Sequence, residues 1–332
     1  MPTNFWKDIS TPIYALAPME DVTDTVFREI VLAVSQSEQL NVVFTEFCST
    51  DGLCHPVGKD KVIHRLQVNE TERALLKEKN VKIVAQIWGT RPEKFQETAK
   101  LITNEYNFDG IDINMGCPVR KIVQQGGCSA LIGNPTLAKE IIRATQEATH
   151  LPVSVKTRTG LKEHTTESWL SHIFECHPTA VTLHCRTQSD MSERPADYQQ
   201  MKIAVALRNA VSPETVLLGN GDIFTTEQAE AFVQSTGAEG AMFGRGIFHN
   251  PWLFAGPNHA VSLDERIELL LKHALLYEQT WGRGKNFAIL RRFFKIYVNQ
   301  LPNAAHLRAR LMETETFDDV KRLTDDFISE SR

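Results

Sequence analysis

The chain has 332 residues, more than the roughly 250 of a single α/β barrel, so a barrel with a small additional domain fits its length. Its 42% hydrophobic and 23% charged residues exclude general disorder, and its formal net charge of −5 excludes a protein that coats nucleic acid through overall positive charge. The sequence shows no signal-peptide core and no apolar run of about 20 residues, so we expect a cytoplasmic protein without membrane contact.

A repeated unit of strand, turn and helix organises the first part of the chain. Short runs rich in β-branched and aliphatic residues predict eight strands, at 13–19, 41–47, 81–89, 110–116, 152–160, 180–187, 215–223 and 240–246. Helical periodicity occurs between most of them, for example over 91–106, 135–149 and 225–236, where Thr225 or Thr226 would cap the helix. The nearly continuous apolar strands indicate a parallel sheet covered on both sides. The pattern predicts a TIM (β/α)8 barrel, because an open doubly wound sheet would need a glycine-rich turn after its first strand.

From residue 251 the pattern predicts helices alone, beginning near Ser262 and broken at 281–284 and 301–303. No acidic residue occurs between Gln279 and Met312. The basic residues of this stretch are Arg283, Lys285, Arg291, Arg292, Lys295, Arg308 and Arg310, with aromatic residues among them. A solvated helix face is the alternative interpretation, but cations interleaved with aromatic rings favour RNA binding.

In such a barrel, chemistry is assembled at the C-terminal ends of the strands. Gly221 and Gly244, after the last two strands, would let backbone amides approach a phosphate, to which Arg245 would add a charged contact. Lys156 and His184 suit the N1 and O2 edge of a flavin ring. Taken singly, His184 is as well explained as a core histidine, and Lys156 as a Schiff-base lysine.

Motifs in chain order resemble those of the tRNA-dihydrouridine synthases. They are APMEDVTD at 17–24, AQIWG at 85–89, DINMGCPVRK at 112–121, GGCSAL at 126–131, VKTR at 155–158, HCRT at 184–187, GNGDI at 219–223 and GRG at 244–246. The resemblance covers essentially the whole predicted barrel and the helical tail, and this many motifs in one order are highly specific.

The resemblance implies an FMN-dependent enzyme that uses NADPH to reduce the C5–C6 double bond of specific tRNA uridines. Reduced FMN would deliver hydride from N5 to C6, and Cys117 would give a proton to C5. An unperturbed thiol, with a pKa of about 8.5, is mostly protonated at neutral pH, as a general acid must be. The implied FMN contacts are Pro18, Met19, Glu20, Gln86, Lys156, His184, Asn220, Gly221, Asp222, Gly244 and Arg245.

The target uridine must leave the tRNA fold to reach a flavin, so cations would hold the RNA backbone. We expect the tRNA contacts to be Asn114, Arg120, Lys121, Arg158, Arg186, Arg283, Lys285, Arg291, Arg292 and Lys295. The expected organisation is a catalytic barrel over 1–250 and a tRNA-binding helical domain over 251–332. We also expect a monomer without a metal, and we find no dedicated NADPH motif.

Two segments depart from the family pattern. Cys128 occupies a position where the family usually has a small residue, so it is either a second thiol close to the site or a small packed residue, and we favour the second. The loop at 191–198 reads MSERPADY instead of the commoner Tyr-x-Gly-x-Ala form. The six cysteines lack the C-x-x-C spacing of a zinc ribbon or redox site, which indicates reduced thiols.

Three other functions remain open at this point. The first is an FMN barrel that reduces a small pyrimidine or another enone, which the basic tail disfavours. The second is a flavin-free aldolase-type barrel that uses Lys156 as a Schiff base. The third is a non-catalytic tRNA-binding protein, which the presence of Cys117, Lys156 and His184 disfavours.

Overall fold

We describe the protein from a computed structural model. The structure describes residues 4–257, 259–282, 284–299, 301 and 304–331, with side chains to residue 329. Among these residues, no helix combines the length and the apolar character needed to cross a membrane.

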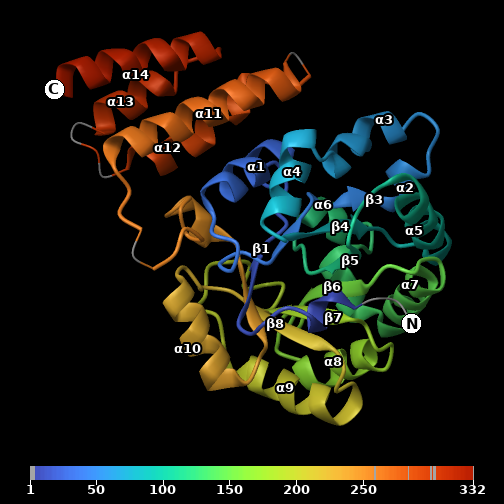
Figure 1. Cartoon of the computed structure of the whole chain (residues 1–332). Coiled ribbons are helices and arrows are strands. Elements are labelled where there is room, and N and C mark those ends of the chain that lie inside the picture. The colour runs from blue at the N-terminus through green and yellow to red at the C-terminus, as the bar shows by residue number, and fades with distance from the viewer. Residues whose placement is uncertain (1–3, 258, 283, 300, 302–303, 332) are drawn as a thin grey trace.

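Eight parallel strands close into a barrel, which confirms the predicted TIM fold (Figure 1). The barrel strands are β1 (Ile13–Leu16), β2 (Val42–Phe44), β4 (Lys82–Trp88), β5 (Gly110–Met115), β6 (Val153–Arg158), β7 (Ala180–His184), β8 (Val216–Asn220) and β9 (Gly240–Phe243). The barrel closes where β1 pairs with β9 on one side and with β2 on the other. A short strand that the sequence did not predict, β3 (Cys48–Ser49), pairs with the end of β4. The barrel strands are shorter than predicted because the residues after them leave the sheet to form the mouth.

Helices surround the barrel. They are α1 (Thr25–Val34), α2 (Thr50–Leu53), α3 (Lys59–Val62), α4 (Glu70–Glu78), α5 (Pro92–Glu105), α6 (Arg120–Val123), α7 (Pro135–Glu147), α8 (Thr166–Phe174), α9 (Gln199–Val211) and α10 (Thr226–Thr236). The three helices named from the sequence are present as α5, α7 and α10. Thr225 is the cap of α10, since its side chain accepts a hydrogen bond from the amide of Gln228.

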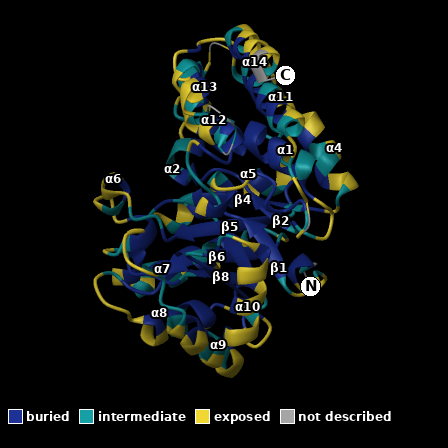
Figure 2. Ribbon diagram, turned by 90° about the vertical axis from the view of Figure 1, so that its left-hand side faces the viewer, coloured by how far each residue is buried: buried dark blue, intermediate teal, exposed yellow. Residues whose placement is uncertain are grey.

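The strands are buried on both faces, as their apolar sequences indicated (Figure 2). Along β1, Ile13 and Ala15 pack inside the barrel, whereas Tyr14 and Leu16 pack against the surrounding helices. Trp6, before the first strand, belongs to the inner cluster, so the interior is a packed core. This core also contains hydrogen-bonded polar side chains, among them Gln86 and Asp112.

Four helices follow the barrel and lie over α1 and α4 (Figure 1). They are α11 (Leu263–Trp281), α12 (Arg291–Val298), α13 (Ala304–Leu311) and α14 (Phe317–Ser331). Ser262 and Glu265 form a capping box at the start of α11, as expected from the change of pattern near Ser262. The break between α13 and α14 was not predicted. Its sequence signal is Thr316, whose hydroxyl accepts the amide hydrogen of Asp319.

Aromatic packing joins these helices to the barrel. The ring of Phe293 on α12 lies 4.9 Å from that of Phe27 on α1. Phe254, which precedes α11, contacts Phe243 of β9 at 5.3 Å between ring centroids. The helical tail is thereby held beside the barrel mouth.

Candidate active site

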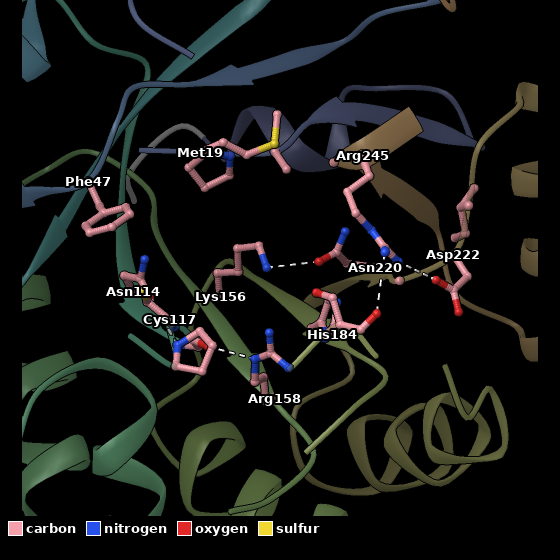
Figure 3. Close-up of a pocket in the computed structure, with 18 of the residues that line it drawn as sticks. Met19, Phe47, Asn114, Cys117, Lys156, Arg158, His184, Asn220, Asp222 and Arg245 are labelled. Carbon is pink, nitrogen blue, oxygen red and sulfur yellow. Dashed lines mark hydrogen bonds and ion pairs between the residues drawn. The ribbon is translucent and has the colours of Figure 1, made fainter. Parts of the chain in front are cut away.

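A pocket at the barrel mouth brings together most residues predicted from the strand ends (Figure 3). Its lining contains Ala17, Pro18, Met19, Phe47, Asn114, Gly116, Cys117, Pro118, Lys156, Arg158, His184, Ser192, Asn220, Gly221, Asp222, Ile223, Phe224, Gly244 and Arg245. They lie on or after every barrel strand except β4, as expected where parallel strands end at one rim.

The loop after β5 holds Cys117 by its backbone on both sides. Asn114 Oδ1 accepts hydrogen bonds of 3.0 Å from the amides of both Gly116 and Cys117. The carbonyl of Cys117 accepts a hydrogen bond of 2.8 Å from the Ser129 hydroxyl. Asn114 is itself oriented by Gln86, whose Oε1 accepts its side-chain NH₂ at 2.9 Å. The sulfur therefore lies in the pocket at a position fixed by the strand.

The Cys117 thiol is more acidic than the sequence interpretation assumed. A hydrogen-bonding contact with the Cys128 thiol is the main cause that lowers the pKa of Cys117 to about 7, and it outweighs the burial that would raise it. Arg158 and Lys156 act in the same direction. More of the thiol is therefore ionised at neutral pH than in an unperturbed cysteine.

Lys156 and His184 lie on neighbouring strands at the floor of the pocket (Figure 3). Lys156 Nζ donates a hydrogen bond of 3.1 Å to Asn220 Oδ1, and burial followed by the charge of Arg158 lowers the pKa of Lys156 to about 8. Burial, again followed by Arg158, also lowers the pKa of His184 well below its usual range, so its imidazole is neutral. His184 Nδ1 is buried without a protein partner.

Arg245 follows β9, and an ion pair with Asp222, which follows β8, holds its side chain in position. Arg245 Nη2 donates a hydrogen bond of 2.7 Å to Asp222 Oδ1, and half of the Arg245 side chain, 49%, is exposed. Burial alone would raise the pKa of Asp222, but its hydrogen bond from Arg186 holds that pKa below its usual range. Gly221 has a φ of +117°, which favours glycine. A Cβ added at Gly244 would be in ordinary van der Waals contact with Ala17, at 3.9 Å.

Some predicted FMN and tRNA contacts point elsewhere. The Glu20 carboxylate does not line the pocket and pairs with Arg65. Gln86 lies inside the barrel and donates to Asp112 at 2.7 Å. Arg158 lines the pocket, but its guanidinium binds backbone carbonyls, including that of Gly116 at 2.8 Å. Arg186 is buried and pairs with Asp222.

The remaining basic residues divide into exposed and internally bound groups. Arg120 and Lys121 are exposed on α6, which projects from the body of the molecule, and Lys295 is exposed on α12 (Figure 2). The tail residues with internal partners are Lys285, which pairs with Asp24; Arg291, which donates to the carbonyl of Thr314; and Arg292, which is exposed and donates to the carbonyl of Asp21. Arg283 lies outside the described residues.

The sequence interpretation missed several lining residues, most notably Phe47. Its ring stands beside Cys117 at the mouth (Figure 3). An aromatic residue at the end of the second predicted strand was the available signal. Ala17, Gly116, Pro118, Ser192, Ile223 and Phe224 also line the pocket, and each adjoins a predicted residue or belongs to a loop considered there.

The fold and the pocket define a TIM-barrel protein whose mouth combines a reactive thiol, a buried lysine, a neutral histidine and a glycine-arginine anion cradle. The chain belongs to the dihydrouridine synthase family, because the family model described as Dihydrouridine synthase (Dus) matches residues 15–331.

Similar proteins agree with this membership. The chain is 40% identical to "Probable tRNA-dihydrouridine synthase" of Staphylococcus aureus (strain MRSA252) over 329 residues, 98% of this chain and 96% of that protein. It is 39% identical to "Probable tRNA-dihydrouridine synthase 2" of Bacillus subtilis (strain 168), with 98% and 97% covered. A solved structure of an old yellow enzyme homologue from Zymomonas mobilis aligns with a TM-score of 0.48 at 12% identity, over 72% of this chain and 86% of that one. A likeness at that level has no bearing on function.

Proposed function

We propose that the protein is a flavin-dependent tRNA-dihydrouridine synthase, which reduces the C5–C6 bond of specific uridines in tRNA. The observation that carries the proposal is the placement of Cys117, Lys156 and His184 around one pocket in a chain of this family. The tRNA substrate also agrees with a cytoplasmic protein, as expected from the sequence.

The pocket fits FMN by a polar group that it leaves without a partner. His184 lines the pocket, and its Nδ1 is buried without a hydrogen-bond partner. An unpartnered buried polar atom costs about 1–3 kcal/mol, so a ligand that satisfies this atom gains affinity. The backbone at Gly221 and Gly244, together with the Arg245 guanidinium, forms a cradle suited to a phosphate. Bound and reduced by NADPH, FMN would supply the hydride that goes to C6 of the uracil.

The residues of this chain then have separate tasks. Cys117 gives its proton to C5, and the sulfur is held for this by Asn114 and Ser129. Lys156 lines the pocket and would favour negative charge on a bound cofactor. We assign the remaining FMN contacts to the pocket residues predicted from the sequence, whereas Glu20 and Gln86 act by supporting neighbouring residues.

Outside the pocket, cations would hold the RNA while a uridine is extruded. Arg120 and Lys121 are exposed just after the catalytic loop. The helical tail, which we propose as the tRNA-binding domain, places Lys295 in solvent. In Figure 2, α6 lies toward the same side of the molecule as α12 and α13 of the helical tail, so one RNA could contact both α6 and the tail.

One observation also suits the Schiff-base alternative, because a lysine with a pKa of about 8 is a better nucleophile than an ordinary lysine. The visible absorption spectrum of the purified protein separates the two functions. We expect flavin bands that bleach with NADPH without oxygen and return when unmodified tRNA is added. In Cys117→Ala, bleaching should be unchanged and the return about 10²–10⁴-fold slower. A colourless protein that does not take up FMN would overturn the proposal.

A further inference from the structure

Cys128 lies beside the active-site cysteine, although eleven positions separate them in the sequence. It begins the 3₁₀ helix Cys128–Gly133, is fully buried and packs with Phe47 and Ile122 in a small cluster that Cys117 also contacts. The next residue, Ser129, binds the Cys117 carbonyl through its amide at 3.3 Å and its hydroxyl at 2.8 Å. The two cysteine backbones are thus held together.

The backbone conformation of Cys128 adds to this placement. Its φ is +52°, in the left-handed region that residues with a Cβ seldom occupy. Gly126, two residues earlier, has a φ of +82°. The Cys128 side chain packs in the small cluster that the Cys117 side chain contacts, so the two thiols lie close together. Cys128 is fully buried and packed, as the sequence interpretation favoured, and it also lies against Cys117.

The groups that influence the pKa of Cys117 come from three parts of the chain. Cys128 approaches from the 3₁₀ helix, the backbone at Val119 from the same loop, and Arg158 and Lys156 from β6. The two cations are already engaged, Arg158 by carbonyls and Lys156 by Asn220. Of these three side chains, Arg158 and Lys156 are basic, whereas Cys128 is a thiol like Cys117.

We propose that Cys128 is a positioning residue for proton transfer, and that its thiol donates an S–H···S hydrogen bond to Cys117 Sγ. This inference rests on the proposed function. In the step, the Cys117 S–H bond breaks and a C5–H bond forms on the uracil, while the hydride from the reduced cofactor completes the reduction at C6. The remaining Cys117 thiolate keeps the hydrogen bond from Cys128 until solvent returns a proton.

Cys128 is suited to this task because it remains protonated. Burial, followed by its contact with Cys117, raises the pKa of Cys128 well above its usual value. A buried thiol that keeps its proton is a permanent donor, and a donor to a thiolate favours the ionised form. Cys128 would therefore make Cys117 a stronger acid without competing as the proton source.

The test compares Cys128→Ala, which removes the donor, with Cys128→Ser, which keeps one. The pH dependence of Cys117 alkylation by iodoacetamide is followed by peptide mass spectrometry, with Cys117→Ala to assign the product. We expect Cys128→Ala to lower the alkylation rate at pH 7 about tenfold and to move the profile toward the ordinary thiol pKa of about 8.5. Cys128→Ser should stay near the parent protein, and thermal unfolding of each variant verifies that it is folded.

A second measurement connects this contact to turnover. The rate at which tRNA reoxidises the reduced flavin should decline at a higher pH in Cys128→Ala than in the parent. An alkylation profile unchanged in Cys128→Ala, or displaced equally in both variants, would overturn the inference and leave Cys128 as a packing residue. Since alkylation needs neither flavin nor tRNA, this result is independent of any failure of the proposed function.

Discussion

The indole Nε1 of Trp281 donates a hydrogen bond of 2.9 Å to Oδ2 of Asp24. Lys285 Nζ lies 3.3 Å from the same oxygen and 3.8 Å from the centre of the Trp281 ring. Asp24 also caps α1 through the amide of Phe27 and belongs to the same loop as Met19, which lines the pocket. The helical tail and the pocket wall are thus joined through one carboxylate.

Trp281→Phe keeps an aromatic ring but removes the donor to Asp24. We expect a loss of about 1 kcal/mol in the free energy of unfolding, and a several-fold rise in the KM for tRNA, with flavin reduction by NADPH unchanged. Trp169→Phe is the matched control, because Trp169 Nε1 makes a similar bond of 3.0 Å to Thr157 on β6. Equal KM values for tRNA in the two variants would show that the Trp281 contact only stabilises the fold.

Glu46 lies near Lys285, where the helical tail meets the barrel, and it should make stability depend on pH. Burial, followed by nearby Asp24 and Glu20 and opposed by Lys285, raises the pKa of Glu46 from 4.5 to about 7. Ionisation therefore costs more in the folded chain than in the unfolded chain, so this group lowers stability progressively as pH rises from about 4.5 to about 7. Glu46→Gln removes that dependence.

Relative to the parent, Glu46→Gln should gain up to about 1.4 kcal/mol of unfolding free energy per pH unit across this window, and stay level above it. Urea titrations at pH 5, 6, 7 and 8 measure the difference. Exposed Glu140→Gln controls for the change from carboxylate to amide. A difference between Glu46→Gln and the parent that is the same at all four pH values would refute the pH dependence.

Arg245→Ala should weaken FMN binding about tenfold to a hundredfold, because a hydrogen bond to a charged group contributes about 1.5–3 kcal/mol. Quenching of flavin fluorescence on titration of flavin-free protein gives the Kd. Arg194→Ala is the control, since its side chain is 80% exposed and belongs to the neighbouring loop. Equal affinities in the two variants would remove Arg245 from the phosphate site.

Lys295→Ala should weaken tRNA binding and reduce the slope of log Kd against log salt by about one, as expected for a lost phosphate contact. Arg291→Ala is the comparison, because the Arg291 guanidinium is occupied by the carbonyl of Thr314 at 2.8 Å and at 3.0 Å. It should lower stability without changing the slope. If the slopes of both variants equal that of the parent, the RNA surface lies elsewhere.

The barrel and most of the pocket could be predicted because they depend on short-range patterns. The eight strand runs and the residues just after them fix which side chains reach the rim, and Lys156, His184 and Asn220 were found in this way. The direction of a side chain within a loop was not predictable. Glu20 follows Met19 directly but turns to Arg65, a residue 45 positions away.

In the basic tail, too, the direction of each side chain could not be predicted from the sequence. Lys285 and Lys295 are alike in sequence, yet Lys285 binds Asp24 on the barrel while Lys295 is exposed. Composition predicted cations that meet phosphates, but an ion pair between segments about 260 residues apart has no local signal. The acidity of Cys117 was missed because it arises from Cys128 across the turn.

Hydrogen bonds connect the side chains of Asp112, Gln86 and Asn114 in series. This series separates two properties of the active-site loop. Gln86 donates to Asp112 at 2.7 Å and accepts from Asn114 at 2.9 Å, so each amide has one possible orientation. Asn114 must then present its oxygen to the Cys117 amide. The position of Cys117 is therefore fixed from the barrel interior, whereas residues 119–126 are mostly exposed to solvent. Substitutions in the outer loop can therefore change the surface around the pocket while the Cys117 backbone keeps its geometry.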